Sequence, residues 1–346
     1  MTDIASSGKY IYLDGASTSL LRPPCVAEAV CEALGSFGSD SRGTYSASLL
    51  ASRTVFRTRQ KISEMYGLDD PARVVFTSGA TESLNIAISG LLRPGTHAVS
   101  TVLEHNSVLR PLYLKESEGA SLSFAGCDAN GRISPSDIEA LIRPETVLVA
   151  CTHVSNVTGN RTDIRAIGEI CRRRGVLFLV DAAQSAGFFP IDMLEMKIDI
   201  LCFSGHKGLM APQGTGCLLV REGITIPPFK VGGTGVQSFS RSHPSEMPTA
   251  LEAGTLNGHG IAGLFAALQY IENMGVDAIR EKAGELAHRF LLGVSPIEGV
   301  TIYGDTDDPD RAPIASLNLA GRDSSEISDI LEQRYKIYTR SGVHCA

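Results

Sequence analysis

The chain has 346 residues, about twice the size of a typical domain, and its 31 Lys and Arg against 38 Asp and Glu give a formal net charge of −7. Because phosphate binding is driven by clustered Lys and Arg, this acidic balance without a basic run argues against nucleic acid as a partner. No apolar run reaches the roughly 18 residues that a membrane helix needs, so no membrane partner is expected either.

The termini and the cysteines indicate the compartment. The N-terminal sequence MTDIASSGKY has neither the basic start nor the apolar stretch of a signal peptide. None of the eight cysteines forms a C-x-x-C pair. We therefore expect a cytoplasmic protein whose cysteines are reduced and mostly buried.

Helical and strand-like patterns alternate from about residue 20 to about residue 220. Helical periodicity predicts helices over 22–37, 48–66, 80–92, 106–118, 134–142 and 162–174. Short apolar runs predict strands over 73–77, 98–102, 121–124, 146–152, 176–180, 198–203 and 216–220. This alternation predicts an α/β fold with a mostly parallel sheet that is flanked by helices.

The composition changes at about 221–258, which is rich in Gly, Pro, Ser and Thr. Two long helices are expected after it, over 259–274 and 277–292, and then strands around one helix at 324–335. We expect an N-terminal segment over 1–20, a large domain over 21–257 and a smaller α+β domain over 258–346.

Polar residues follow five of the predicted strands. They are the sequences TSGATE at 77–82, EHN at 104–106, THVSN at 152–156, DAAQ at 181–184 and SGHK at 204–207. In an open α/β sheet, ligands bind outside the carboxyl ends of the strands. The first of these turns opens a helix, whose N-terminal N–H groups favour an anion.

Each of these residues also has an ordinary structural explanation. Asp181 could cap a helix, His105 could be a satisfied loop histidine, and Lys207 could be a solvated cation. Lys207 follows Asp181 by 26 positions and lies at the next strand end, so both could face one cleft. This pair suits pyridoxal phosphate (PLP), which needs a lysine for its aldehyde and an acid for its pyridine nitrogen.

Two other classes of enzyme are disfavoured. The histidines at 105, 153 and 206 lack a carboxylate at a usual ligand spacing, so no metal site is expected. A G-x-G-x-x-G sequence does not follow the first strand, which argues against a dinucleotide-binding dehydrogenase.

Together these motifs resemble the class V aminotransferase family, of PLP fold type I, and within it the cysteine desulfurases. The resemblance rests on DAAQ at 181–184, SGHK at 204–207, Glu104-His105, Ser155-Asn156 and EAGT at 252–255, and it runs from Tyr12 to the last residue. The ending RSGVHCA at 340–346 is similar to the segment that carries the active cysteine in group II, SUF-type members.

The resemblance implies a role for each motif. Lys207 would bind the cofactor covalently and move protons, Asp181 would pair with the pyridine nitrogen, and His105 would stack on the ring. Gln184 and Asn156 would contact the ring oxygen or the substrate, and Arg340 would bind the substrate. The phosphate would be held by Ala80, Thr81, Ser204 and His206. Thr255 would reach the phosphate of a neighbouring subunit, which implies a homodimer.

The resemblance also implies that Cys345 is the nucleophile. Its thiolate would take sulfur from L-cysteine, release alanine and pass the persulfide sulfur to an acceptor protein for iron–sulfur cluster or thiocofactor synthesis. Arg340 and His344 lie near Cys345 in the sequence and could lower the pKa of its thiol or supply a base. Without the flanking motif, Cys345 would be interpreted as an inert terminal thiol.

The sequence also departs from the family. Relatives continue for a few dozen residues and supply a second arginine there, so the small domain is expected to be incomplete. The segment 42–46 and Val343 also differ from the usual pattern. Selenocysteine lyase, cysteine sulfinate desulfinase, another class V lyase or aminotransferase, and an inactive truncated scaffold therefore stay open as alternatives. Loss of Cys345 should discriminate among the enzymes, because removal of selenium or sulfinate should tolerate it better than removal of sulfur from cysteine.

Overall fold

The protein is represented by a computed structural model that describes residues 10–40 and 43–345. The first nine residues of the expected segment 1–20 lie outside the described residues. They include most of the N-terminal sequence in which a signal peptide was not expected. Arg42 of the divergent segment 42–46 and the terminal Ala346 also lie outside the described residues.

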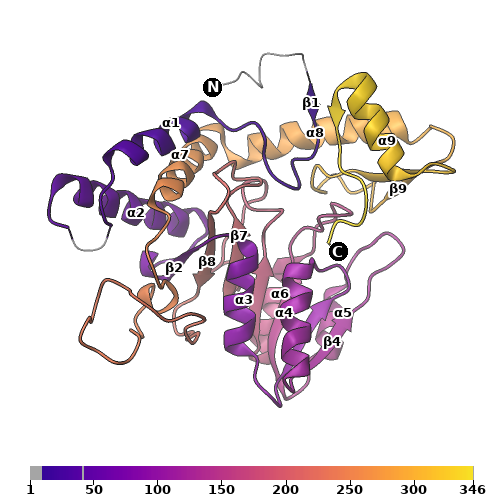
Figure 1. Ribbon diagram of the computed structural model, residues 1–346. Coiled ribbons are helices and arrows are strands. Elements are labelled where there is room, and N and C mark those ends of the chain that lie inside the picture. The colour runs from indigo at the N-terminus through magenta and orange to yellow at the C-terminus, as the bar shows by residue number, and fades with distance from the viewer. Residues whose placement is uncertain (1–9, 41–42, 346) are drawn as a thin grey trace.

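A sheet of seven strands forms the centre of the molecule (Figure 1). Its order is β2-β8-β7-β6-β5-β3-β4, and β8 is antiparallel to both of its neighbours while the remaining pairs are parallel. The strands are β2 (Val74–Thr77), β3 (His97–Thr101), β4 (Ser121–Ala125), β5 (Thr146–Thr152), β6 (Leu177–Asp181), β7 (Ile200–Ser204) and β8 (Gly216–Val220). The expected α/β fold with a mostly parallel sheet is confirmed.

Alternate residues of each central strand enter one of two apolar clusters, as the two-residue period of a strand requires. In β5, Val149 joins a cluster with Ile167 of α6, whereas Leu148 joins a second cluster with Leu84 of α3 and Leu112 of α4. Both faces of the sheet are therefore covered by helices, and the strands read as continuous apolar runs.

The helices around the sheet lie close to their expected positions. They are α1 (Pro24–Ser36), α2 (Ser46–Met65), α3 (Ala80–Leu91), α4 (Asn106–Ser117), α5 (Pro135–Leu141), α6 (Ile164–Arg174) and α7 (Gly258–Met274). Helix α7 packs against α1 and α2 and contributes to the first apolar cluster. No described helix is long and apolar enough to cross a lipid bilayer.

The remaining elements lie above the sheet in the view of Figure 1. Helix α8 spans Val276–Val294, β9 (Val300–Tyr303) pairs with β10 (Ser316–Leu319), and β1 (Ile11–Tyr12) pairs in parallel with β11 (Ile337–Tyr338). The helix expected over 324–335 is wrong in its second half. Helix α9 covers Ser324–Ile330, and Leu331–Tyr335 forms a turn of π-helix.

The cysteines are all free thiols. Cys151, Cys171, Cys202 and Cys217 are buried, but Cys31 and Cys127 are exposed and Cys25 is half-buried. The expectation that most cysteines are buried is therefore too strong, because α1 and the loop after β4 present theirs to solvent.

Candidate active site

Five of the strand ends that carry polar residues point in one direction. Because β2, β3, β5, β6 and β7 run parallel to one another, their carboxyl ends lie at one edge of the sheet. The strand ends and the turns that follow them contain most of the residues singled out in the sequence, whereas Thr255, Arg340 and Cys345 come from other parts of the chain. The site is therefore built from segments that lie far apart in the chain.

Asp181 and Lys207 are electrostatic partners at this edge. Asp181 ends β6, is 3% exposed and accepts a hydrogen bond at Oδ1 from the Ala183 N–H at 2.9 Å. Burial raises its pKa, and that N–H and Lys207 oppose the rise. Burial lowers the pKa of Lys207; Asp181 acts against this, and Arg340 adds to the lowering. A lysine with a lowered pKa more readily presents the neutral, nucleophilic amine.

The turn from β2 to α3 forms an anion-binding shape. The Ser204 Oγ accepts from the Ala80 N–H at 2.8 Å, which joins the end of β7 to the first residue of α3. A Cβ on Gly216 would come within 2.4 Å of the Gly79 Cα, so only glycine permits this close approach of β8 to the turn. The N–H groups in the first turn of α3 then favour a phosphate.

His105 is fixed in one orientation beside this turn. It caps α4, and its Nδ1 accepts the Ser107 N–H at 3.0 Å, so the proton of the neutral ring lies on Nε2. The Ser107 Oγ lies 2.9 Å from that Nδ1 and 2.8 Å from the Thr81 Oγ1. Burial lowers the pKa of His105, with help from the charges of Lys207, Arg110 and Arg340. The neutral ring therefore offers an N–H at Nε2, and its Nδ1 lone pair is taken up by the Ser107 N–H.

The segment that ends in Cys345 lies against two of these turns. The Asn106 N–H donates to the Cys345 carbonyl at 2.8 Å, and the Asn156 Nδ2 donates to the His344 carbonyl at 2.7 Å. Cys345 itself has a φ of 58°, in the left-handed region that a non-glycine residue rarely adopts, and it is exposed. The strands β3 and β5 thus position the last residues of the described chain.

Of the remaining residues singled out in the sequence, His206 and Gln184 lie in the turns after β7 and β6, and Arg340 precedes the Cys345 segment. Burial lowers the pKa of His206, together with Lys207 and Arg22. The Gln184 Nε2 donates to the Ala16 carbonyl at 2.9 Å. Arg340 is exposed but affects the pKa of Lys207 and of His105. Thr255 is exposed and makes no hydrogen bond to the other site residues within the described chain.

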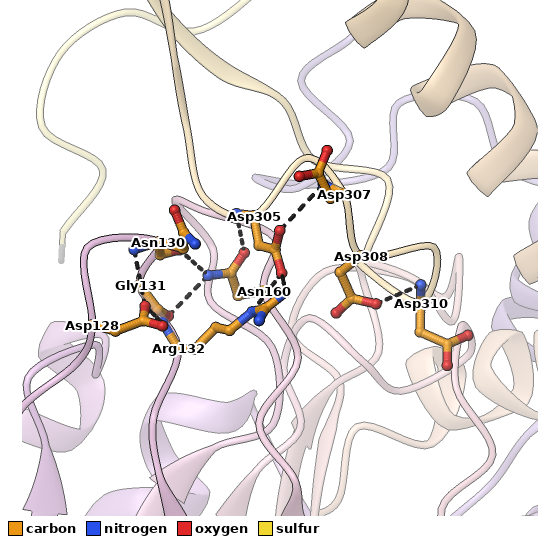
Figure 2. A network of polar contacts seen from close by, with 9 residues as sticks. All are labelled: Asp128, Asn130, Gly131, Arg132, Asn160, Asp305, Asp307, Asp308 and Asp310. Carbon is orange, nitrogen blue, oxygen red and sulfur yellow. Dashed lines mark hydrogen bonds and ion pairs between the residues drawn. The ribbon is translucent and has the colours of Figure 1, made fainter.

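Asn160 anchors the turn that carries Asn156, although the sequence analysis did not single it out. Its Nδ2 donates to the carbonyls of Asn130 and Gly131 at 2.7 and 2.9 Å, and its Oδ1 accepts the Asp305 N–H at 2.8 Å. Figure 2 shows this network, in which Arg132 also pairs with Asp305. A single asparagine gives no pattern, so only its long-range partners reveal the role.

Glu104 is a second residue whose environment the sequence did not reveal. It is fully buried, and its Oε1 accepts from the Thr101 Oγ1 at 2.7 Å and from the Thr152 N–H at 3.0 Å. Oε2 is buried without a hydrogen-bond partner among the described residues. Burial raises its pKa to about 8, with a further contribution from Asp181. Glu104 is therefore a neutral acid at neutral pH.

This environment predicts a pH-dependent stability. Because the folded chain keeps a proton on Glu104 that the unfolded chain loses near pH 4.5, the free energy of unfolding falls as pH rises from there to about 8. A glutamine has no such proton to lose. We expect Glu104→Gln to be more stable than the parent at pH 8, by up to about 5 kcal/mol, and similar to it near pH 5.

Urea unfolding of both proteins at pH 5 and pH 8 measures this difference. Glu116→Gln, at an exposed position of α4, is the matched control. Its free energy of unfolding should differ from that of the parent by the same amount at both pH values. A parallel pH dependence in Glu104→Gln and the parent would contradict the argument.

The residues at this edge fit PLP. The Oδ2 of buried Asp181 makes no hydrogen bond to a described residue and can accept from a pyridinium N–H, and Lys207 lies beside it. The start of α3, with Ser204, suits the phosphate. Within the described ranges, no group of three or more His, Cys, Asp or Glu side chains could hold a metal ion.

The chain belongs to the class V aminotransferase family, which it matches over residues 11–346. It is 33% identical, over 99% of its own length and 86% of the relative's, to a protein of Methanothermobacter thermautotrophicus named probable cysteine desulfurase.

Two solved structures are similar throughout. An apo cysteine desulfurase from Thermococcus onnurineus has a TM-score of 0.92 at 34% identity, and the match covers 97% of this chain and 85% of that one. The cysteine desulfurase CsdA from Escherichia coli, solved with an S-sulfonic acid, has a TM-score of 0.88 at 28% identity with the same coverage.

Proposed function

We propose that this chain is a PLP-dependent cysteine desulfurase that converts L-cysteine to L-alanine and keeps the sulfur as a persulfide on Cys345. The family membership and the similarity to proteins named cysteine desulfurase support the activity. The bound cofactor would supply an electron sink for the substrate carbons.

The observation that carries the proposal is the position of the Cys345 segment. It is hydrogen-bonded to Asn106, the first residue of α4, and to Asn156, in the turn after β5. Asp181 is the last residue of β6, and Lys207 lies in the turn after the neighbouring strand β7. A cysteine that lies against this edge can reach a substrate that Lys207 holds there.

The chain's own groups divide the work. Asp181 would keep the pyridine nitrogen protonated, and the phosphate would be bound by Ala80, Thr81, Ser204 and His206. Lys207 would bind the cofactor and move a proton, and His105 would stack on the cofactor ring. Asn156, Gln184 and Arg340 orient the ring oxygen and the substrate.

Cys345 carries out the sulfur transfer. Its thiolate attacks the substrate sulfur, the carbon–sulfur bond breaks, and the electron pair returns to the substrate carbon. The products are Cys345 with one added sulfur and, after protonation, alanine. Atoms balance, because cysteine plus the thiol gives alanine plus the persulfide.

We further propose a cytoplasmic homodimer in which Thr255 reaches the phosphate site of the second subunit, and an acceptor protein that takes the sulfur. The exposed position of Thr255 supports the first part. The division into domains over 21–257 and 258–346, and the SUF-type relationship, also stay predictions.

The assay that tests the function is alanine formation from L-cysteine by the PLP-loaded chain, with a reductant to release the sulfur as sulfide. Alanine and sulfide should appear in equal amounts. A PLP-loaded protein that forms neither product would contradict the proposal.

A further inference from the structure

The segment 11–19, which we call the N-terminal strap, contacts both the strand before the Cys345 segment and the turn that carries Lys207. At its first end, β1 pairs in parallel with β11, and Ile11 and Leu13 donate their N–H groups to the carbonyls of Lys336 and Tyr338 at 2.8 and 2.9 Å. Strand β11 ends at Tyr338, two residues before Arg340. This end of the strap therefore holds the strand that leads into the Cys345 segment.

The second end of the strap holds the turn of Lys207. The Ser19 N–H donates to the His206 carbonyl at 2.8 Å, and the Ser19 Oγ donates to the Lys207 carbonyl at 2.7 Å. The Thr18 Oγ1 lies 3.0 Å from the His206 Nδ1 and also donates to the His206 carbonyl at 3.3 Å. Thr18 and Ser19 thus make hydrogen bonds to the backbone of His206 and Lys207 and to the His206 side chain.

The two ends are joined by short contacts within the strap. The Tyr12 hydroxyl donates to the Thr18 carbonyl at 2.8 Å and lies 3.1 Å from the Asp14 carbonyl. The Asp14 carbonyl also accepts the N–H groups of Ser17 and Thr18, at 3.1 and 3.4 Å. Burial raises the pKa of Tyr12, so its hydroxyl stays a donor. The strap is therefore a closed turn whose two ends are linked by hydrogen bonds within it.

We propose that the N-terminal strap couples the position of the Cys345 segment to the Lys207 turn, and that Tyr12, Thr18 and Ser19 are positioning residues for sulfur transfer. The catalytic consequence rests on the proposed function, whereas the coupling is a property of the fold. A displacement of about 1 Å between a nucleophile and its target can cost on the order of a hundredfold in rate.

The test uses the PLP-loaded chain with Thr18→Val and Ser19→Ala combined, and Tyr12→Phe as a second variant. Ser17→Ala is the matched control, because it is also a serine-to-alanine change in the strap and the Ser17 hydroxyl makes no hydrogen bond to a described residue. The readouts are hydrogen exchange of residues 337–345, the alkylation rate of Cys345, and kcat and KM for L-cysteine.

We expect both test variants to show exchange over 337–345 and alkylation of Cys345 that are at least about threefold faster. Their kcat should fall about tenfold at nearly constant KM. Cys31 and Cys127, which are exposed, serve as internal references whose alkylation stays constant. Ser17→Ala should match the parent in every readout.

Other results would overturn the coupling. One is unchanged exchange and alkylation at 337–345 in Tyr12→Phe, in a protein whose β5 and β6 amides stay protected. Another is faster hydrogen exchange in the Lys207 turn of either test variant, with exchange over 337–345 and alkylation of Cys345 unchanged. If the parent forms no alanine, the proposed function fails but the exchange and alkylation still test the coupling.

Discussion

Replacing Lys207 with alanine is expected to reduce alanine formation from L-cysteine by at least about a thousandfold, since no other group replaces a nucleophile that also moves protons. Lys207 lies in the turn after β7, beside the buried carboxylate of Asp181. Its lowered pKa, which comes mainly from burial, favours the neutral amine that attacks an aldehyde.

Lys207→Arg is the matched control for charge. It keeps a cation near Asp181 but offers no amine, because a guanidinium stays protonated. We expect it to be as inactive as Lys207→Ala, with a melting temperature closer to that of the parent. Borohydride treatment of the PLP-loaded parent should add the mass of reduced cofactor to the peptide that contains Lys207. Turnover above about a tenth of the parent's in either variant would contradict the assignment.

The edge where this site lies could be predicted because its residues follow apolar runs. Such runs, as in Thr146–Thr152, mark buried strands, and parallel strands bring their carboxyl ends to one edge. The direction of β8 could not be predicted in this way. Its run Gly216–Val220 looks like the others, and only the strand register shows that it is antiparallel to β7.

The contacts that hold the site in place could not be predicted, for a different reason. Asn160, Ser107 and Thr18 act through polar contacts with residues that are far away in the sequence or in another turn. The pairing of β1 with β11 joins the two ends of the described chain, and two-residue strands carry no periodicity. A lone polar residue in a loop has many ordinary explanations, so only the folded arrangement reveals its partner.

The second large effect concerns Cys345. We expect Cys345→Ala to lower alanine and sulfide formation from L-cysteine at least about a hundredfold, because the sulfur loses its acceptor. Cys127→Ala is the matched control: Cys127 is also an exposed free thiol, in the loop after β4, and this variant should keep the parent's rate. Trapping the parent during turnover should add one sulfur atom to the peptide with Cys345 and none to the peptide with Cys127.

The same variant separates the desulfurase from the related lyases. Selenium and sulfinate leave a substrate carbon more readily than sulfur does and need no thiolate to accept them. Alanine formation from selenocysteine or cysteine sulfinate that survives in Cys345→Ala, together with loss of the reaction with cysteine, is therefore the expected pattern. If Cys345→Ala instead keeps the parent's rate with L-cysteine, Cys345 is not the sulfur acceptor. The hydrogen bonds from Asn106 and Asn156 would then only hold the backbone of residues 344–345 against the site.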